Sequence, residues 1–123
     1  MRYIARVIQR PLSEQAFLVL TALAEEPLHG YAIVKSVGEL TDDRVRLSVG
    51  TLYGVLDRLV ADGLVERDRD EVHQGRQRRY YKITDTGAWA LSAEAERLAA
   101  NVRVATERLR LRGLRPSIAG GSL

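Results

Sequence analysis

Apolar residues recur at helical spacing through the first half of this chain, and polar breaks separate the stretches. Ser13 is a suitable N-cap for a first helix that runs to about residue 26, where Pro27 closes it. Its expected core face consists of Phe17, Leu20, Leu23 and Ala24. A second helix begins at about residue 30 and ends at the polar residues 41–43. It is expected to bury some of Tyr31, Ile33, Val34 and Val37.

The third stretch has the clearest helical pattern, with Ser48 as its N-cap and Gly63 as its C-terminal stop. Its single apolar stripe consists of Leu52, Val55, Leu56, Leu59 and Val60. At about 100° per residue, the opposite face consists of Gly50, Thr51, Gly54 and Arg58, with Tyr53 at the border. A face that is small and polar near the helix N-terminus suits a helix that approaches base edges in a DNA groove.

Two short runs of β-branched and aromatic residues, 64–69 and 78–83, lie on either side of a turn that contains Gly75. They predict a two-stranded hairpin with a mobile tip. Tyr80 and Tyr81 point to opposite faces of the second strand, so one packs on the core and the other faces outwards or meets DNA. Which of the two is buried stays open.

A last helix follows, and Thr84 is placed to cap it. Its apolar residues alternate three and four apart for about three heptads: Ala88, Leu91, Ala95, Leu98, Val102, Ala105 and Leu109. This seam extends beyond so small a core, which favours dimerisation, whereas an intramolecular core face is the alternative. Residues 113–123 are rich in Gly, Ser and Pro and are expected to be disordered.

The order of three helices and a hairpin predicts a mainly α fold with a small β-hairpin, a winged helix-turn-helix followed by a dimerisation helix. We expect residues 1–84 to form the winged domain with an N-terminal helix or arm, 85–112 the dimerisation helix, and 113–123 a disordered tail.

Composition narrows the function classes. The 123 residues contain no cysteine, which excludes disulfides and thiolate metal sites and makes the cytoplasm the default location. No apolar stretch is long enough to span a membrane, so a soluble, unexported protein is expected. Two histidines, His29 and His73, without a ligand pattern indicate no metal. Because no catalytic constellation or cofactor motif stands out, we expect neither an enzyme nor a cofactor.

The formal net charge is +3, and all the cationic side chains are arginine apart from Lys35 and Lys82. A GC-rich genome would produce the same excess, so the placement of the arginines says more than their number. Arg76, Arg78 and Arg79 crowd one turn. The expected DNA-contacting residues are His29, Tyr31, Lys35, Ser48, Thr51, Tyr53, Arg58, Gln74, Arg76 and Arg78.

Several of these residues have an alternative role. Ser48 caps its helix whether or not it meets a phosphate, and Tyr53 is equally consistent with a half-packed core residue. Arg58 could pair with a neighbouring aspartate, and Arg76 could belong to a mobile charged loop rather than reach a minor groove. His29 could cap the second helix or lie near a phosphate.

Several local runs go beyond this generic order of elements. They are residues 29–31 (His-Gly-Tyr), 47–53 (Leu-Ser-Val-Gly-Thr-Leu-Tyr), 56–59 (Leu-Asp-Arg-Leu), 63–65 (Gly-Leu-Val), 75–76 (Gly-Arg) and 79–84 (Arg-Tyr-Tyr-Lys-Ile-Thr), followed by Gly87. In continuous order from about Leu12 to Leu109, the chain resembles the PadR family of bacterial transcriptional regulators. The resemblance implies a homodimeric repressor with its third helix and wing on DNA, often released by a small phenolic or drug-like compound.

Two departures from the family pattern matter. Gly54 stands where the family more often has proline. The multidrug-sensing members have a tryptophan midway along the last helix, where this chain is aliphatic around Leu98; Trp89 lies nearer the helix start. Trp89 is expected to pack between the last helix and the winged domain, with ligand contact as the alternative.

The resulting hypothesis is a homodimeric, sequence-specific transcriptional regulator that binds a pseudo-palindromic operator in double-stranded DNA. Its dimer contacts are expected at Leu91, Ala95, Leu98, Val102, Ala105 and Leu109, and its effector is expected to be a small aromatic or drug-like molecule. The alternative is a winged-helix module for protein interaction that does not bind DNA.

Overall fold

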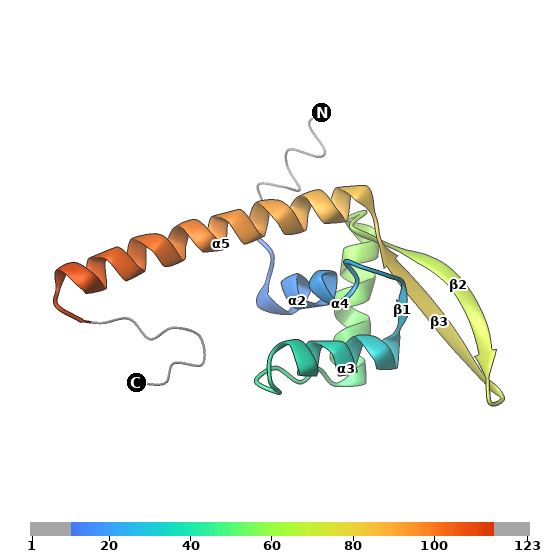
Figure 1. Cartoon of the computed structure of the whole chain (residues 1–123). Helices are drawn as coiled ribbons and strands as arrows, with labels where there is room; N and C mark the ends of the chain where they lie inside the picture. The colour runs from blue at the N-terminus through green and yellow to red at the C-terminus, as the bar shows by residue number, and fades with distance from the viewer. Residues whose placement is uncertain (1–10, 115–123) are drawn as a thin grey trace.

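The computed structural model describes residues 11–114, and it contains helices and a small sheet in the expected order (Figure 1). The elements are α2 (Glu14–Ala22), β1 (Leu28–His29), α3 (Gly30–Leu40), α4 (Val49–Ala61), β2 (Val65–His73), β3 (Arg76–Ile83) and α5 (Asp85–Leu111). The expected N-terminal arm at residues 1–10, and the part of the expected disordered tail at 115–123, lie outside the described residues.

Local capping signals fix where the helices begin. Ser13, Ser48 and Thr84 each accept a hydrogen bond from the backbone N–H three residues later, at 3.1, 3.1 and 2.9 Å, which confirms the three predicted N-caps. Gly63 has a φ of 75° directly after the C-cap of α4, which confirms its predicted role at the end of that helix. These helix ends depend only on neighbouring residues, so the sequence predicted them.

The first helix is shorter than predicted. It ends at Ala22 instead of about residue 26, and Ala24, which was expected on the core face, is exposed. The backbone N–H of Leu23 is shared between the carbonyls of Val19 and Leu20, which tightens the last turn. Residues 23–27 then connect α2 to β1 at the edge of the sheet.

The sheet has three antiparallel strands in the order β1-β3-β2, so the predicted two-stranded ribbon lacked one strand. β1 is only two residues long, with Leu28 opposite Tyr81 and His29 opposite Tyr80. The hairpin of β2 and β3 is also longer than predicted, and it turns at Gln74 and Gly75, whose φ angles are 52° and 78°. Two consecutive positive φ values are typical of the tight hairpin turns that match strand twist.

The core lies where α2, α3 and α4 meet the base of the sheet and the start of α5. Its fully buried large side chains are Val19, Leu20, Leu23, Ile33, Val37, Leu52, Leu56, Leu64 and Val65. Burial of each contributes about 1.5–3 kcal/mol. On α4, Leu52, Leu56 and Leu59 are buried, whereas Val60, at the edge of the predicted stripe, is 38% exposed.

Tyr81 is the buried tyrosine of the pair, at 3% exposure, and Tyr80 is half-buried on the other face of β3. The Tyr81 ring lies against that of Tyr53 on α4, with 6.5 Å between ring centroids. The packing of α4 on this face of the sheet therefore decides which tyrosine enters the core.

Glu94 on α5 has a buried side chain, which is only 5% exposed. Arg97 donates from Nε to this carboxylate at 3.2 Å and also from a terminal guanidinium nitrogen. These hydrogen bonds lower the pKa of Glu94, and the backbone N–H of Leu12 adds to the effect. Glu94 therefore interacts with Arg97 one turn along α5 and with the backbone N–H of Leu12 in the segment that precedes α2.

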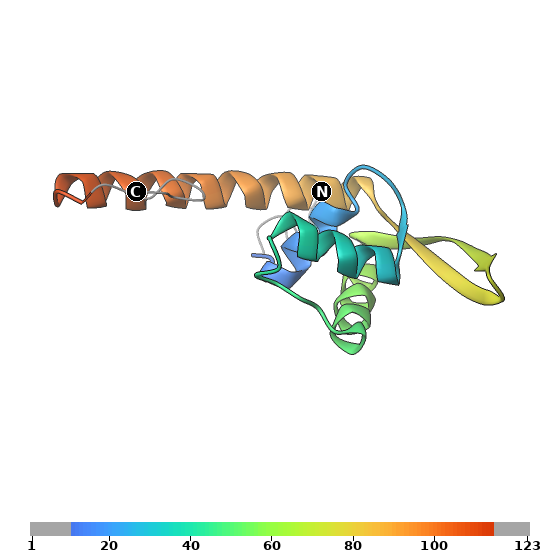
Figure 2. The same ribbon diagram turned by 60° about the horizontal axis from the view of Figure 1, so that its bottom comes forward.

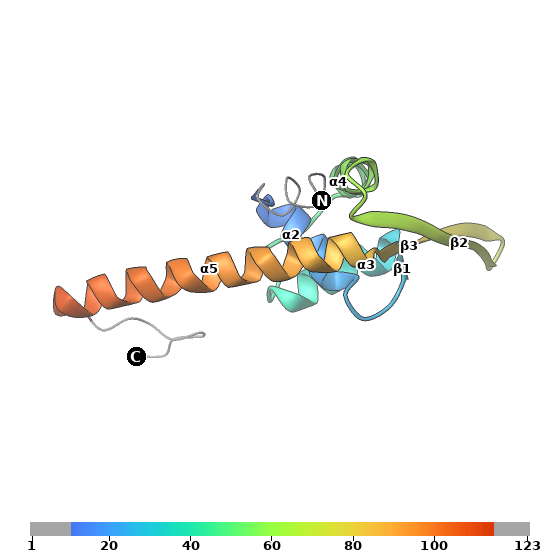
Figure 3. The same ribbon diagram turned by 90° about the horizontal axis from the view of Figure 1, so that it is seen from above.

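Beyond Glu94, α5 leaves the body, and none of residues 95–111 is buried. The far half of α5 and the wing, β2 and β3, project from opposite sides of the helical body (Figures 1 and 2). Seen from above, α4 is viewed nearly end-on while α5 lies across the view (Figure 3). Among the described residues, no helix has the length and apolar character needed to cross a membrane.

Candidate nucleic-acid interface

The N-terminus of α4 presents a small, polar surface. Ser48 Oγ accepts the backbone N–H of Thr51 at 3.1 Å and donates to Thr51 Oγ1 at 3.0 Å. Because Thr51 Oγ1 accepts this bond, its own O–H stays available for an outside acceptor. Gly50, Thr51, Gly54 and Arg58 are all exposed, which confirms the predicted outward face. A Cβ at Gly50 or Gly54 would meet no atom within 4 Å, so this face is open to a close approach.

Tyr53 lies between the core and solvent, at 36% exposure. Its hydroxyl rests over Gly30, where an added Cβ would come within 2.7 Å of the oxygen. Gly30 therefore lets the start of α3 approach α4 closely, which sequence reasoning missed. The geometry fits the half-packed alternative for Tyr53, with a hydroxyl that still faces the neighbouring groove.

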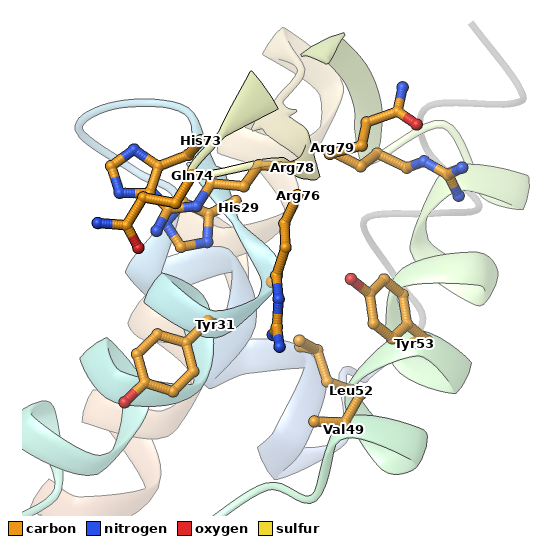
Figure 4. Close-up of a pocket in the computed structure, with 12 residues that line it drawn as sticks. His29, Tyr31, Val49, Leu52, Tyr53, His73, Gln74, Arg76, Arg78 and Arg79 are labelled. Atoms are coloured by element: carbon orange, nitrogen blue, oxygen red, sulfur yellow. The ribbon is translucent and has the colours of Figure 1, made fainter. Parts of the chain in front are cut away.

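The wing faces α4 and the start of α3 across a groove of about 630 Å³, which we call the wing groove. Its lining residues are His29, Gly30, Tyr31, Val49, Leu52, Tyr53, His73, Gln74, Arg76, Gln77, Arg78 and Arg79. Figure 4 shows Arg76 extending from the wing into this space, with Tyr31 on one side and Tyr53 on the other. Tyr31 is 74% exposed, a large value for an aromatic ring, and it lies at the groove edge.

The structure brings together six of the ten predicted contact residues in the wing groove: His29, Tyr31, Tyr53, Gln74, Arg76 and Arg78. Thr51 and Arg58 instead line a second groove of about 490 Å³ between α4 and the residues that begin α2. Lys35 lies in a shallow depression on α3 that Tyr31 also borders. Arg79 also lines the wing groove; it was noted in the arginine cluster but was not among the predicted contacts.

His29 lines the wing groove and also contacts α3 and β3. Its Nδ1 accepts the backbone N–H of Ala32 at 3.4 Å, so it caps α3 as one alternative proposed. Its ring meets Tyr80 edge to face, with 5.3 Å between centroids. Burial lowers the pKa of His29 from its ordinary value, and the positive charges of Arg78 and His73 lower it further, against the opposing effect of Glu71. The neutral imidazole, which can accept the capping bond, is thereby favoured.

The predicted seam on α5 is open to solvent along its far half. Leu98, Val102 and Leu109 are 38%, 62% and 40% exposed, and Ala95 and Ala105 are also exposed. Only Leu91 packs against the core of its own chain. The intramolecular alternative therefore accounts for the start of the seam and leaves the remainder unpaired within the described chain.

The packing role predicted for Trp89 is wrong within this chain, because the side chain is 67% exposed. At about 100° per residue it points away from the side of α5 that carries Gly87, Ala90 and Glu94 into the core. No group of three His, Asp or Glu side chains in residues 11–114 is close enough to hold a metal ion.

Three helices, a short β1 and a two-stranded wing beside an exposed helix N-terminus define a winged helix-turn-helix protein. The chain belongs to the Transcriptional regulator PadR-like family, whose profile matches residues 19–93.

A 37.1 kDa protein in transposon TN4556 of Streptomyces fradiae is 41% identical over 87 residues, which are 71% of this chain and 24% of that protein. This chain thus spans about a quarter of that relative. A transcriptional regulator of Mycobacterium tuberculosis is 38% identical over 80 residues, 65% of this chain and 71% of that protein.

Solved structures agree on the fold. A PadR family transcriptional regulator from Eggerthella lenta is 32% identical, with a TM-score of 0.60 and coverage of 76% of this chain and 79% of that one. A PadR family regulator from Clostridium difficile has a TM-score of 0.67 at 22% identity, and the match covers 79% of this chain and 99% of that one. Bacillus subtilis PadR, solved in complex with operator DNA, has a TM-score of 0.59 at 22% identity, and the match covers 67% of this chain and 46% of that one. The mainly α fold with a wing is therefore shared.

Proposed function

We propose that this protein is a homodimeric, sequence-specific DNA-binding regulator that represses transcription from a pseudo-palindromic operator. The observation that carries the proposal is the convergence of the open N-terminal face of α4 with the arginines of the wing groove. The operator-bound PadR from Bacillus subtilis, which has the same fold, supports DNA as the partner. We assign no catalytic role, cofactor or membrane partner, and we expect the protein to act in the cytoplasm.

Each element has a distinct role in this proposal. The first turns of α4 enter the major groove, where Gly50 and Gly54 permit close approach and the Thr51 hydroxyl donates to a base edge or phosphate. Arg76, at the turn of the wing, reaches the adjacent minor groove, whose negative potential attracts a guanidinium. His29, Tyr31, Lys35, Ser48, Tyr53, Arg58, Gln74 and Arg78 are proposed to contribute the surrounding backbone contacts.

Dimerisation is proposed to run through the far half of α5. The seam of Ala95, Leu98, Val102, Ala105 and Leu109 in one protomer would pack against a second copy, with the half-buried Leu91 where the seam meets the core of its own chain. Residues 85–112 would then be the dimerisation helix and 1–84 the winged domain. Two α4 helices then meet successive major grooves about 34 Å apart, which requires a two-fold symmetric operator. The apolar side chains left open on α5 support this arrangement.

The first experiment is titration of a fluorescently labelled duplex from the protein's own promoter region, followed by anisotropy at low and high salt. We expect Thr51→Ala and Arg76→Ala each to weaken binding about tenfold, and affinity to fall steeply with salt. Arg112→Ala, at the far end of α5, removes the same charge as Arg76→Ala and serves as the control. Unchanged affinity in both site variants would refute the assignment, and no binding even at low salt would favour a protein-interaction module.

Release by an effector is the remaining part of the proposal. A small aromatic or drug-like molecule in the dimer would favour a spacing of the winged domains that misses the two grooves. Thermal-shift measurements with phenolic compounds test this, because a ligand that binds the folded protein raises its melting temperature. A compound that stabilises the protein should also weaken operator binding, whereas stabilisation without release would contradict the mechanism.

A further inference from the structure

A wing that approaches phosphates should avoid negative charge, yet β2 contains four acidic residues. They are Glu66, Asp68, Asp70 and Glu71. Arg69, on the same strand, bridges two of them: it donates from Nε to Glu71 and from Nη1 to Asp68, both at 2.7 Å. Asp68 also lies 3.7 Å from the ammonium group of Lys82. Arg69 therefore compensates the charge of two carboxylates on β2.

Arg69 also makes a stacking contact. Its guanidinium carbon lies 4.1 Å from the centre of the Tyr80 ring, on the neighbouring strand. The Tyr80 hydroxyl also lowers the pKa of Glu71, and the Tyr80 ring meets the edge of His29, the cap of α3. A continuous set of contacts thus connects Arg69 on the wing to the start of α3, and we call it the wing clasp: Arg69, Glu71, Tyr80 and His29.

The wing clasp lies at an irregularity of the sheet. Arg67 pairs with Tyr81 and Asp70 pairs with Arg79, so the two residues Asp68 and Arg69 oppose the single residue Tyr80. Such a bulge bends the strand and changes the direction of everything beyond it. The residues beyond it are the outer wing, 70–79, which includes Arg76 and Arg78. The direction of these two arginines therefore depends on how the bulge is held.

We infer that Arg69 is a positioning residue for DNA recognition, which holds the bulge by bridging Asp68 and Glu71 while it stacks on Tyr80, and so aims the outer wing at the DNA. This inference rests on the proposed function for its effect on affinity. The bridge needs donors that point in two directions and the stack needs a planar group, and a guanidinium supplies both. Lysine has the same charge but lacks the planar group and the donors that point in two directions. Arg69→Lys therefore separates the effect of the charge from that of the guanidinium geometry.

The test combines operator affinity with the orientation of the wing in the free protein. We expect Arg69→Ala and Arg69→Lys each to weaken operator binding about tenfold, because both lose the clasp. Arg67→Ala removes the same charge from the same strand and is expected to cost less than about threefold. Tyr80→Leu should weaken binding as much as Arg69→Ala, and the double variant should be no more than about twofold weaker than either, because both remove one contact. Tyr80→Phe, which retains the ring, should bind more tightly than Tyr80→Leu.

Residual dipolar couplings of the free, full-length protein report the direction of residues 72–79 relative to α4. We expect Arg69→Ala and Arg69→Lys to change these couplings while those of α2, α3 and α4 stay as in the wild type. Full binding by Arg69→Lys would show that Arg69 acts through its charge, and unchanged couplings in Arg69→Ala would show that it does not aim the wing; either result overturns the inference. If the wild type binds no operator, the proposed function fails, and the couplings alone still decide whether Arg69 positions the wing.

Discussion

Replacing Val102 with aspartate places a charge in the middle of the α5 seam, and the same change at Val104 provides a matched control. The two valines are 62% and 61% exposed, and both lie in the part of α5 that leaves the body. Since they are two residues apart, their side chains point about 160° away from each other around the helix. Only Val102 belongs to the seam that we propose to be the dimer contact.

The expected effect follows from the exposed fraction. Complete burial of a valine contributes about 1.5–3 kcal/mol, so burying the open 62% of Val102 contributes about 1–2 kcal/mol in each protomer. Two protomers lose about 2–4 kcal/mol together, which raises the dimer dissociation constant roughly 30- to 1,000-fold. The aspartates add to this loss, because a carboxylate buried in the contact would lose its hydration without gaining a partner.

Sedimentation velocity at a series of protein concentrations measures the result. We expect a dimer for the wild type and for Val104→Asp, and a monomer with unchanged circular dichroism for Val102→Asp. The monomer should also bind the two-fold operator more weakly, since it engages one half-site at a time. A wild type that is monomeric at micromolar concentration, or equal loss in both variants, would refute the assignment of the seam.

Three further predictions concern the fold around the site. Gly87→Ala should destabilise the protein by about 3 kcal/mol in urea unfolding, because the new Cβ would lie 2.0 Å from the carbonyl oxygen of Leu64. Gly54→Ala should stabilise it by about 1 kcal/mol in the same assay, because alanine is the better helix former and the site is open; a loss of stability would show that this face is packed. Because the pKa of His29 is lowered in the folded protein, the imidazole of the unfolded chain takes up its proton at a higher pH than that of the folded chain. The contribution of His29 to the free energy of unfolding is therefore fully present above pH 6.5 and is lost as the pH falls below that value. Between pH 8 and pH 5, the free energy of unfolding in urea should decline less for His29→Asn, which keeps a capping oxygen that does not titrate, than for the wild type. An equal decline in both proteins would contradict this.

Much of the fold could be predicted from local sequence. Ser13, Ser48 and Thr84 identify the three helix starts because a capping side chain bonds to an N–H only three residues away. The exposed face of α4 also followed from helical spacing alone. The DNA-facing role of that surface came from the same pattern and from the family resemblance, and it stays a prediction until the binding experiments.

The sequence by itself thus determined the helix caps, the outward face of α4, the turn of the wing and the family, because each depends on residues within one turn or one continuous motif. Tertiary structure alone decided the two-residue strand β1, the choice of Tyr81 over Tyr80 for the core, the exposure of Trp89 and the wing clasp around Arg69. These features join elements that are far apart in the chain. A pairing such as that of His29 with Tyr80 has no local signal, because the contact exists only once the helical body has brought the two strands together.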